Sequence, residues 1–278
     1  MIATLMMIAL LRDREMSCED AMVAAKYHAG TLGIEGNVSI VKCMPHRRND
    51  SEPMDGWSVD FVQAPDRQFS MRLGLDGQLA QYDRRSSDPG WKHEVNPTWQ
   101  AAAITRGSQL LKSIGNPWTV VPPSLPTRSP AEQKFAYSAT LNNLPIVGSR
   151  VGYDLTFQGP KHTLMKMERW GDIPTPNAKV PTISTMDAVT LVEKTYPSDK
   201  DFEHDGARKV EFGKPVLAYY YRNEYGPKEA NRPARLVWYM TSHHSHRTKY
   251  SVKGGTRGIA VDAVTGSILD DKLGVYRF

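Results

Sequence analysis

Two short hairpin motifs constrain the fold of this chain more than any other sequence feature. The longer one, Arg257–Asp270, places a polar turn at 262–266 between two β-rich segments. The shorter one, Met71–Tyr82, turns at Asp76-Gly77. Gly between alternating apolar residues adopts the positive φ that a tight turn requires. Because the same device recurs, we expect a chain built from repeated units that close with antiparallel hairpins.

Each predicted unit begins with a helix, and strands follow it. Helix starts are indicated by Ser17, by Asn96-Pro97 and by Ser184, since Ser caps free amides and Pro suits the first helical position. Alternating apolar residues after each helix predict antiparallel strands. The predicted fold class is therefore α+β, with repeated units of a helix packed on an antiparallel β-sheet. The expected units are residues 17–90, 96–175 and 182–278.

The segment that precedes these units, residues 1–16, has two interpretations. Ile2–Leu11 is an apolar run about as long as the hydrophobic region of an export signal. It lacks a basic leader, and the charged Arg12–Glu15 follows where a cleavage site of small residues is expected. The segment is either a truncated export signal or an N-terminal stretch packed on the core. The run is too short to cross a membrane of ~30 Å, so no transmembrane span is predicted.

The chain has two cysteines, Cys18 and Cys43, and both fall in the first predicted unit. One lies at a helix start and the other on the strand that follows. They form either one disulfide or two buried free thiols, because a free Cys behaves as a small hydrophobic residue.

A family resemblance appears in two segments. The stretch Gly258–Leu269 resembles the end of a PepSY domain, in which a strand ending in Asp turns through a small residue and Gly into a second strand. The stretch Leu144–Phe157 is similar to the companion module of thermolysin-type protease propeptides, in which Pro, two apolar residues and Gly lead into a long strand. The resemblance covers most of 17–272. It implies an exported, non-catalytic binding or regulatory protein (periplasmic, cell-surface or secreted) whose partner is a peptidase.

The motifs of common enzyme classes are absent from the sequence. It contains no His-Glu-x-x-His, no Gly-x-Ser-x-Gly, no Walker loop and no dinucleotide fingerprint. Lys253-Gly-Gly is followed by a strand pattern and not by the helix of a phosphate loop. We therefore expect no enzymatic activity, no catalytic residues and no cofactor. An enzyme of unrecognised type stays as an alternative.

The C-terminal unit carries the predicted partner contacts. An exposed sheet face or edge strand can dock an extended peptide, and Arg and aromatic side chains often dominate such interfaces. The candidate contact residues are Arg235, Trp238 and Tyr239. The alternative is that Trp238 belongs to the core, in which case alternation places Tyr239 on the opposite face of the strand.

The same region is strongly basic, which favours a second function. No Asp or Glu occurs between Ala230 and Val261, whereas Arg and Lys occur six times, and the whole chain has a formal net charge of +5. Positive potential attracts nucleic acid and other polyanions. Weak, salt-sensitive polyanion binding through a basic surface is the alternative function.

One histidine cluster, at His243, His244 and His246, follows the predicted strand 235–241. If the strand continues, His244 and His246 share one face, and imidazoles at this spacing can bind zinc or copper. No Cys lies nearby. We expect a solvated loop and no metal site, with these three histidines as the weak alternative ligands.

Overall fold

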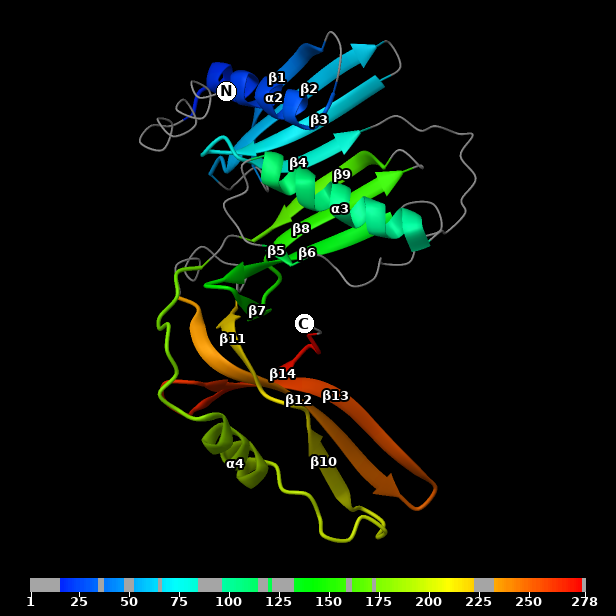
Figure 1. Ribbon diagram of the computed structural model, residues 1–278, viewed down its shortest axis with the longest axis vertical. Coiled ribbons are helices and arrows are strands. Elements are labelled where there is room, and N and C mark those ends of the chain that lie inside the picture. The colour runs from blue at the N-terminus through cyan, green and yellow to red at the C-terminus, as the bar shows by residue number, and fades with distance from the viewer. Residues whose placement is uncertain are drawn as a thin grey trace. The chain divides into compact units, whose positions relative to one another are not determined.

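The computed structural model describes residues 16–34, 38–47, 53–64, 67–84, 97–114, 120–121, 133–158, 162–171, 174–222 and 233–276. The chain divides into two compact units (Figure 1). The N-terminal unit comprises Met1–Tyr137 and Gly152–Trp170, and the C-terminal unit comprises Ser138–Val151 and Gly171–Phe278. The predicted N-terminal segment 1–16 lies outside the described residues except for Met16. No helix in these ranges is long and apolar enough to cross a membrane.

A sheet of mainly antiparallel pairs forms the N-terminal unit. Its strands pair in the order β1 (Ser39–His46), β2 (Gly56–Ala64), β3 (Arg67–Gly74), β4 (Leu79–Arg84), β9 (Thr163–Trp170), β8 (Gly152–Gln158) and β6 (Gln133–Leu141), and the short β5 (Val120–Val121) pairs with β6. The part of β6 up to Tyr137 belongs to this unit, and the rest of the strand belongs to the C-terminal unit. The β3–β4 hairpin turns at Asp76-Gly77, as predicted. Gly77 has a φ of 75°, and Oδ1 of Asp76 accepts a hydrogen bond from the amide of Gln78.

Two helices bury their small or apolar faces against this sheet. In α2 (Cys18–Thr31), Ser17 and Asp20 form a capping box at the first turn, which satisfies amides that have no partner inside the helix. In α3 (Pro97–Ser113), Gly107 allows close approach to the sheet, because a Cβ at this position would meet the ring of Tyr137. The hydroxyl of Tyr137 donates to the carbonyl of Ile104 on the same helix. Both helices contribute to one continuous hydrophobic core.

The C-terminal unit is built around one long hairpin. Its strands pair in the order β7 (Leu144–Gly148), β11 (Val216–Tyr221), β12 (Arg235–Thr248), β13 (Ser251–Asp262) and β14 (Ile268–Leu273), and β10 (Arg208–Phe212) also pairs with β12. The turn predicted at 262–266 is present between β13 and β14. Oδ1 of Asp262 accepts from the amides of Val264 and Thr265, and Gly266 has a φ of 77°.

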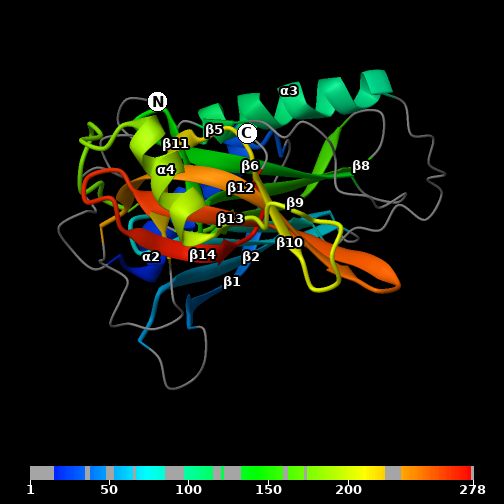
Figure 2. The same cartoon turned by 90° about the horizontal axis from the view of Figure 1, so that it is seen from below.

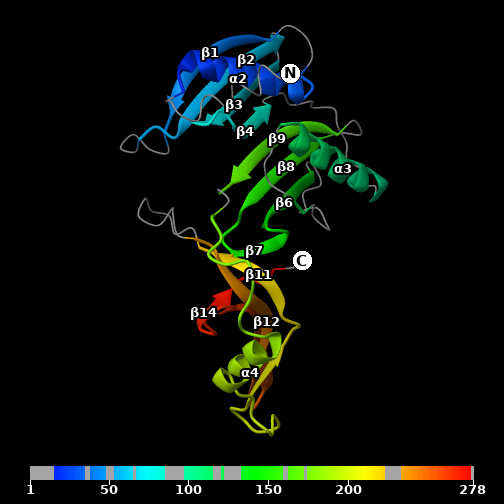
Figure 3. The same cartoon turned by 60° about the vertical axis from the view of Figure 1, so that its left-hand side comes forward.

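Helix α4 (Thr185–Thr195) packs on one face of this hairpin (Figure 3). Ser184 caps it by accepting from the amide of Asp187. Ala188 and Val192 are fully buried against a cluster that the strands supply, with Met240, Ile259 and Val261 as its buried members. The other face of the hairpin has its own small core around Val237, Tyr239 and Ala260.

The prediction of repeated helix-on-sheet units is wrong. The fold is dominated by strands, with three helices in the described ranges. β4 and β9 come from two different predicted units, yet they pair in register from Gln81 to Asp83, so those units share one sheet. In the C-terminal unit β7 and β11 pair in parallel, which makes that sheet mixed. The physical reason is that an open strand edge leaves amides and carbonyls without partners, and a distant strand satisfies them.

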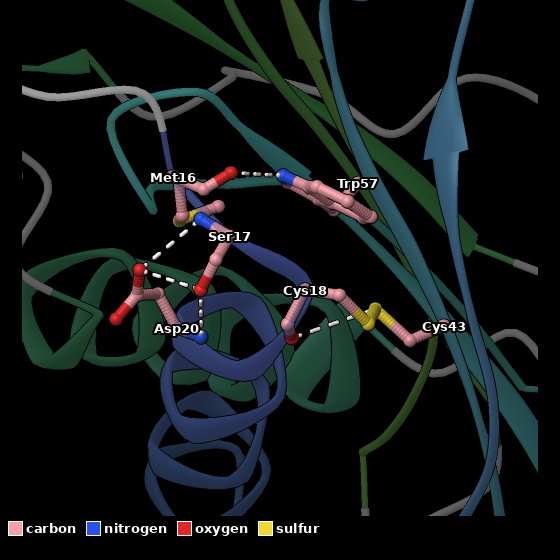
Figure 4. The surroundings of a disulfide bond; sticks show 6 residues. All are labelled: Met16, Ser17, Cys18, Asp20, Cys43 and Trp57. Atoms are coloured by element: carbon pink, nitrogen blue, oxygen red, sulfur yellow. Dashed lines mark hydrogen bonds between the residues drawn. A yellow bond between two sulfur atoms is a disulfide. The ribbon is translucent and has the colours of Figure 1, made fainter.

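A disulfide joins Cys18 to Cys43, which resolves the two alternatives for these cysteines (Figure 4). It connects the first residue of α2 to β1 with a Cα–Cα distance of 6.3 Å. Beside it, Nε1 of Trp57 donates to the carbonyl of Met16 at 2.9 Å. The start of α2 is therefore held to the sheet both covalently and by a hydrogen bond.

His28 makes the stability of the N-terminal unit pH-dependent. Its ring is buried on α2, and Nε2 donates to the carbonyl of Gly77 at 3.0 Å, while Nδ1 is buried with no hydrogen-bond partner. Burial is the main cause that lowers the pKa of His28 below 6.5. At low pH the imidazole of His28 therefore binds a proton more readily in the unfolded chain than in the folded unit.

Above pH 6.5, we expect His28 to contribute no pH dependence to the free energy of unfolding. It should fall as the pH drops from that value toward the folded-state pKa, by at most about 1.4 kcal/mol per pH unit. Urea unfolding at a series of pH values measures this. His28→Gln should flatten the dependence, and His204→Gln, which alters an exposed histidine, should not. A dependence that survives in His28→Gln would contradict the assignment.

Candidate functional site

Two of the three predicted partner-contact residues, Trp238 and Tyr239, form hydrogen bonds within the C-terminal unit. Tyr239 is buried, and its hydroxyl donates to the carbonyl of Gly274 and accepts from the amide of Tyr276, at 3.0 Å each. Nε1 of Trp238 donates to the carbonyl of Ile183 at 2.9 Å, and the ring packs in the α4 core. Arg235 is exposed and lies 3.5 Å from Asp262. The three side chains do not form one contact surface, because alternation along β12 separates Trp238 from Tyr239.

The histidine cluster lies on a strand and not in the predicted loop. β12 continues to Thr248, so His244 and His246 share the face on which α4 packs, and His243 lies on the other face. Nδ1 of His243 is 2.9 Å from Oγ1 of Thr256 on β13. No group of three or more His, Cys, Asp or Glu side chains suited to a metal ion occurs among the described residues.

His244 accepts a hydrogen bond from a neighbouring arginine. Nε of Arg257 donates to Nε2 of His244 at 2.9 Å, so this nitrogen carries no proton, and Oγ of Ser242 is 2.8 Å away. Burial, followed by the charge of Arg257, lowers the pKa of His244. The ring is therefore neutral at pH 7 and serves to position Arg257.

Arg257 is held from a second side by an aromatic ring. Its guanidinium lies 5.6 Å from the ring centroid of Tyr196, just after α4, and the hydroxyl of Tyr196 donates to Asp271 at 2.7 Å. A cation over an aromatic face is attracted by the negative charge of that face. This arrangement orders the guanidinium before any ligand arrives, which lowers the entropy cost of binding.

A groove of about 760 Å³ lies along the far part of the β12–β13 hairpin, where β10 pairs with β12. Figures 1 and 2 both show β10 beside this end of the hairpin. The strand register places Val210, His244 and Gly255 in one cross-strand row. The next row contains Arg208, His246 and Lys253. This groove between β10, β12 and β13 is called the basic groove below.

The backbone of Gly254 and Gly255 forms part of the floor of the basic groove. At Gly255 no atom lies within 4 Å of the position that a Cβ would occupy, so that position faces open space. At Gly254 a Cβ would approach the carbonyl of His244 to 2.6 Å. No strand in the described ranges pairs with the outer edge of Ser251–Arg257. Alternate amides of such an edge point outward and are available as donors.

None of the described side chains that line the basic groove is acidic. Six of them are basic: Arg208, Lys209, His244, His246, Lys253 and Arg257. Lys209 pairs with Glu211 at 2.6 Å. Within the described ranges, neither Arg208 nor Lys253 forms an ion pair, and both are exposed. Two uncompensated charges on one row leave this groove with a positive potential that attracts anions.

The sequence analysis identified the residues of this site that lie on β12 and β13, but not those on β10. It identified the basic segment 230–261 and the histidines, but it did not identify Arg208 and Lys209. The available signal was the alternation of Val210 and Phe212 between charged residues, which is typical of a half-buried strand.

Comparisons with known proteins do not assign this chain to a family. No protein-family model matches the sequence, and no curated protein matches it either.

Proposed function

We propose that this chain is a non-enzymatic binding protein whose C-terminal unit holds an extended anionic polymer in the basic groove. The observation that carries the proposal is the row formed by Arg208, His246 and Lys253, which lies beside a floor of bare glycine backbone. The polymer is bound through its charged groups, without sequence specificity, since the groove offers cations and backbone amides.

Two features support an exported protein of the regulatory type suggested by the PepSY resemblance. The Cys18–Cys43 disulfide is typical of oxidising compartments. In the C-terminal unit a helix packs on antiparallel strands that close with the Asp262–Gly266 turn. The second candidate function is binding of a peptidase or other protein through strand addition. The observation that favours it is the outer edge of Ser251–Arg257, which is open to pairing.

Gly255→Leu tests the proposed site without disturbing the strand. Nothing lies within 4 Å of the added Cβ and the backbone has no positive φ, so the fold should be retained while the side chain fills the groove. We expect binding of a fluorescein-labelled oligothymidylate, measured by anisotropy at low salt, to weaken about tenfold. Labelled polyglutamate provides a second anionic chain without phosphate.

Gly274→Leu is the matched control, because this glycine also has open space around its Cβ and lies outside the groove. It should bind both probes like the unmodified chain. Equal binding by Gly255→Leu and Gly274→Leu would contradict the proposed site. Failure of both polymers to bind, together with capture of an extended neutral peptide, would favour strand addition instead.

A further inference from the structure

The N-terminal unit contains a separate cavity of about 310 Å³. It lies where the end of α2, the helix α3, strands β2 to β4 and the start of β9 meet. Its volume is at the lower end of the range for sites that hold small organic molecules. The basic groove of the C-terminal unit shares no residue with it.

Three buried apolar side chains form part of the inner wall of the cavity. Phe69, Leu110 and Leu164 line it, and all three side chains are at least nine-tenths buried. The ring of Phe69 stacks on Phe61 with a centroid distance of 4.9 Å and lies 6.1 Å from the ring of Tyr82. A wall of this kind favours the apolar body of a ligand, because burial of apolar surface is the main source of binding energy.

The rest of the lining is mixed, and it includes two arginines. Arg84 comes from the end of β4 and Arg106 from α3. The Nη2 atom of Arg106 lies 3.8 Å from the position of a Cβ on Gly33, which places this guanidinium at the C-terminal end of α2. His162 also lines the cavity, and burial followed by the charge of Arg106 lowers its pKa. The positive charge therefore comes from the two arginines, and no Asp or Glu occurs among the described lining residues.

We propose that this cavity binds a small amphipathic carboxylate, with its apolar body against Phe69, Leu110 and Leu164 and its carboxylate at Arg106. A planar guanidinium matches the geometry of a carboxylate, and a charge-assisted hydrogen bond is about twice as strong as a neutral one. A simple inorganic anion would leave the apolar wall unused. An uncharged apolar molecule would leave the charge of Arg106 unused.

The experiment titrates the full chain with 4-phenylbutyrate and with its neutral analogue 4-phenylbutan-1-ol, by isothermal calorimetry. We expect the carboxylate to bind about tenfold more tightly than the alcohol. Arg106→Gln should remove this difference and leave the affinity for the alcohol unchanged. The residue is exposed, so the variant should fold. Lys112→Gln removes an exposed charge from the same helix outside the cavity and should change neither affinity.

Three results would each overturn the proposal: no saturable binding of 4-phenylbutyrate, equal affinities for acid and alcohol, or equal behaviour of the two variants. Tight binding of inorganic phosphate that displaces 4-phenylbutyrate, with no gain from the phenyl group, would assign a simple anion site instead. Because the cavity and the basic groove lie in different units, loss of oligothymidylate binding in Gly255→Leu has no bearing on this outcome.

Discussion

Reversing two charges of the basic groove, with Arg208→Glu and Lys253→Glu in one variant, is expected to reduce oligothymidylate binding about a hundredfold at low salt. The two side chains lie on either side of His246 in one cross-strand row. Each change removes one cation from the path of the polymer and adds a repelling carboxylate. Both residues are exposed and form no ion pair in the described ranges, so the fold should be retained.

The salt dependence of binding gives a second, independent readout. Log affinity falls linearly with log salt concentration, and the slope counts the phosphates that the protein neutralises. Losing two cationic contacts should make the slope shallower by roughly two. An unchanged slope with weaker binding would show that Arg208 and Lys253 act indirectly.

The matched control places the same charge change elsewhere in the C-terminal unit. Lys200→Glu with Lys214→Glu alters two exposed lysines outside the groove. Each Lys or Arg changed to Glu shifts the net charge by −2, so both double variants go from +5 to +1. Equal loss of affinity in the two variants would assign binding to overall charge and not to the groove.

Removing the disulfide, with Cys18→Ser and Cys43→Ser together, is expected to destabilise the N-terminal unit by about 3 kcal/mol. The bond closes a loop across a sequence separation of 25 residues, and opening it gives the unfolded chain more conformations. The bond also fixes the start of α2 on β1, next to the Trp57–Met16 hydrogen bond. Its loss should let the first turn of α2 separate from the sheet more readily.

Urea unfolding with and without a thiol reductant measures this effect. The unmodified chain should lose about as much stability on reduction as the double variant loses by substitution. The double variant should not respond to the reductant. A variant as stable as the unmodified chain, or an unmodified chain that the reductant does not affect, would contradict the structural role of this bond.

Local sequence signals determined the elements whose stabilising groups lie within a few residues of one another. Ser17 and Ser184 cap α2 and α4, and Pro97 is the first residue of α3, as predicted. The turns at Asp76-Gly77 and at 262–266 form where glycine adopts a positive φ and an Asp side chain accepts backbone amides. Each of these interactions is complete within one turn, so the sequence by itself specifies it.

Only the tertiary structure decided which strands are neighbours, and with them both candidate sites. β4 could pair with any strand of suitable length, and its pairing with β9 depends on a core assembled from the whole N-terminal unit. β10 joins β12 across more than twenty residues of sequence, which brings Arg208 to the row of His246 and Lys253. Strand ladders are chemically alike along their length, so the choice of partner is made by packing and edge satisfaction over the entire unit, which no short segment encodes.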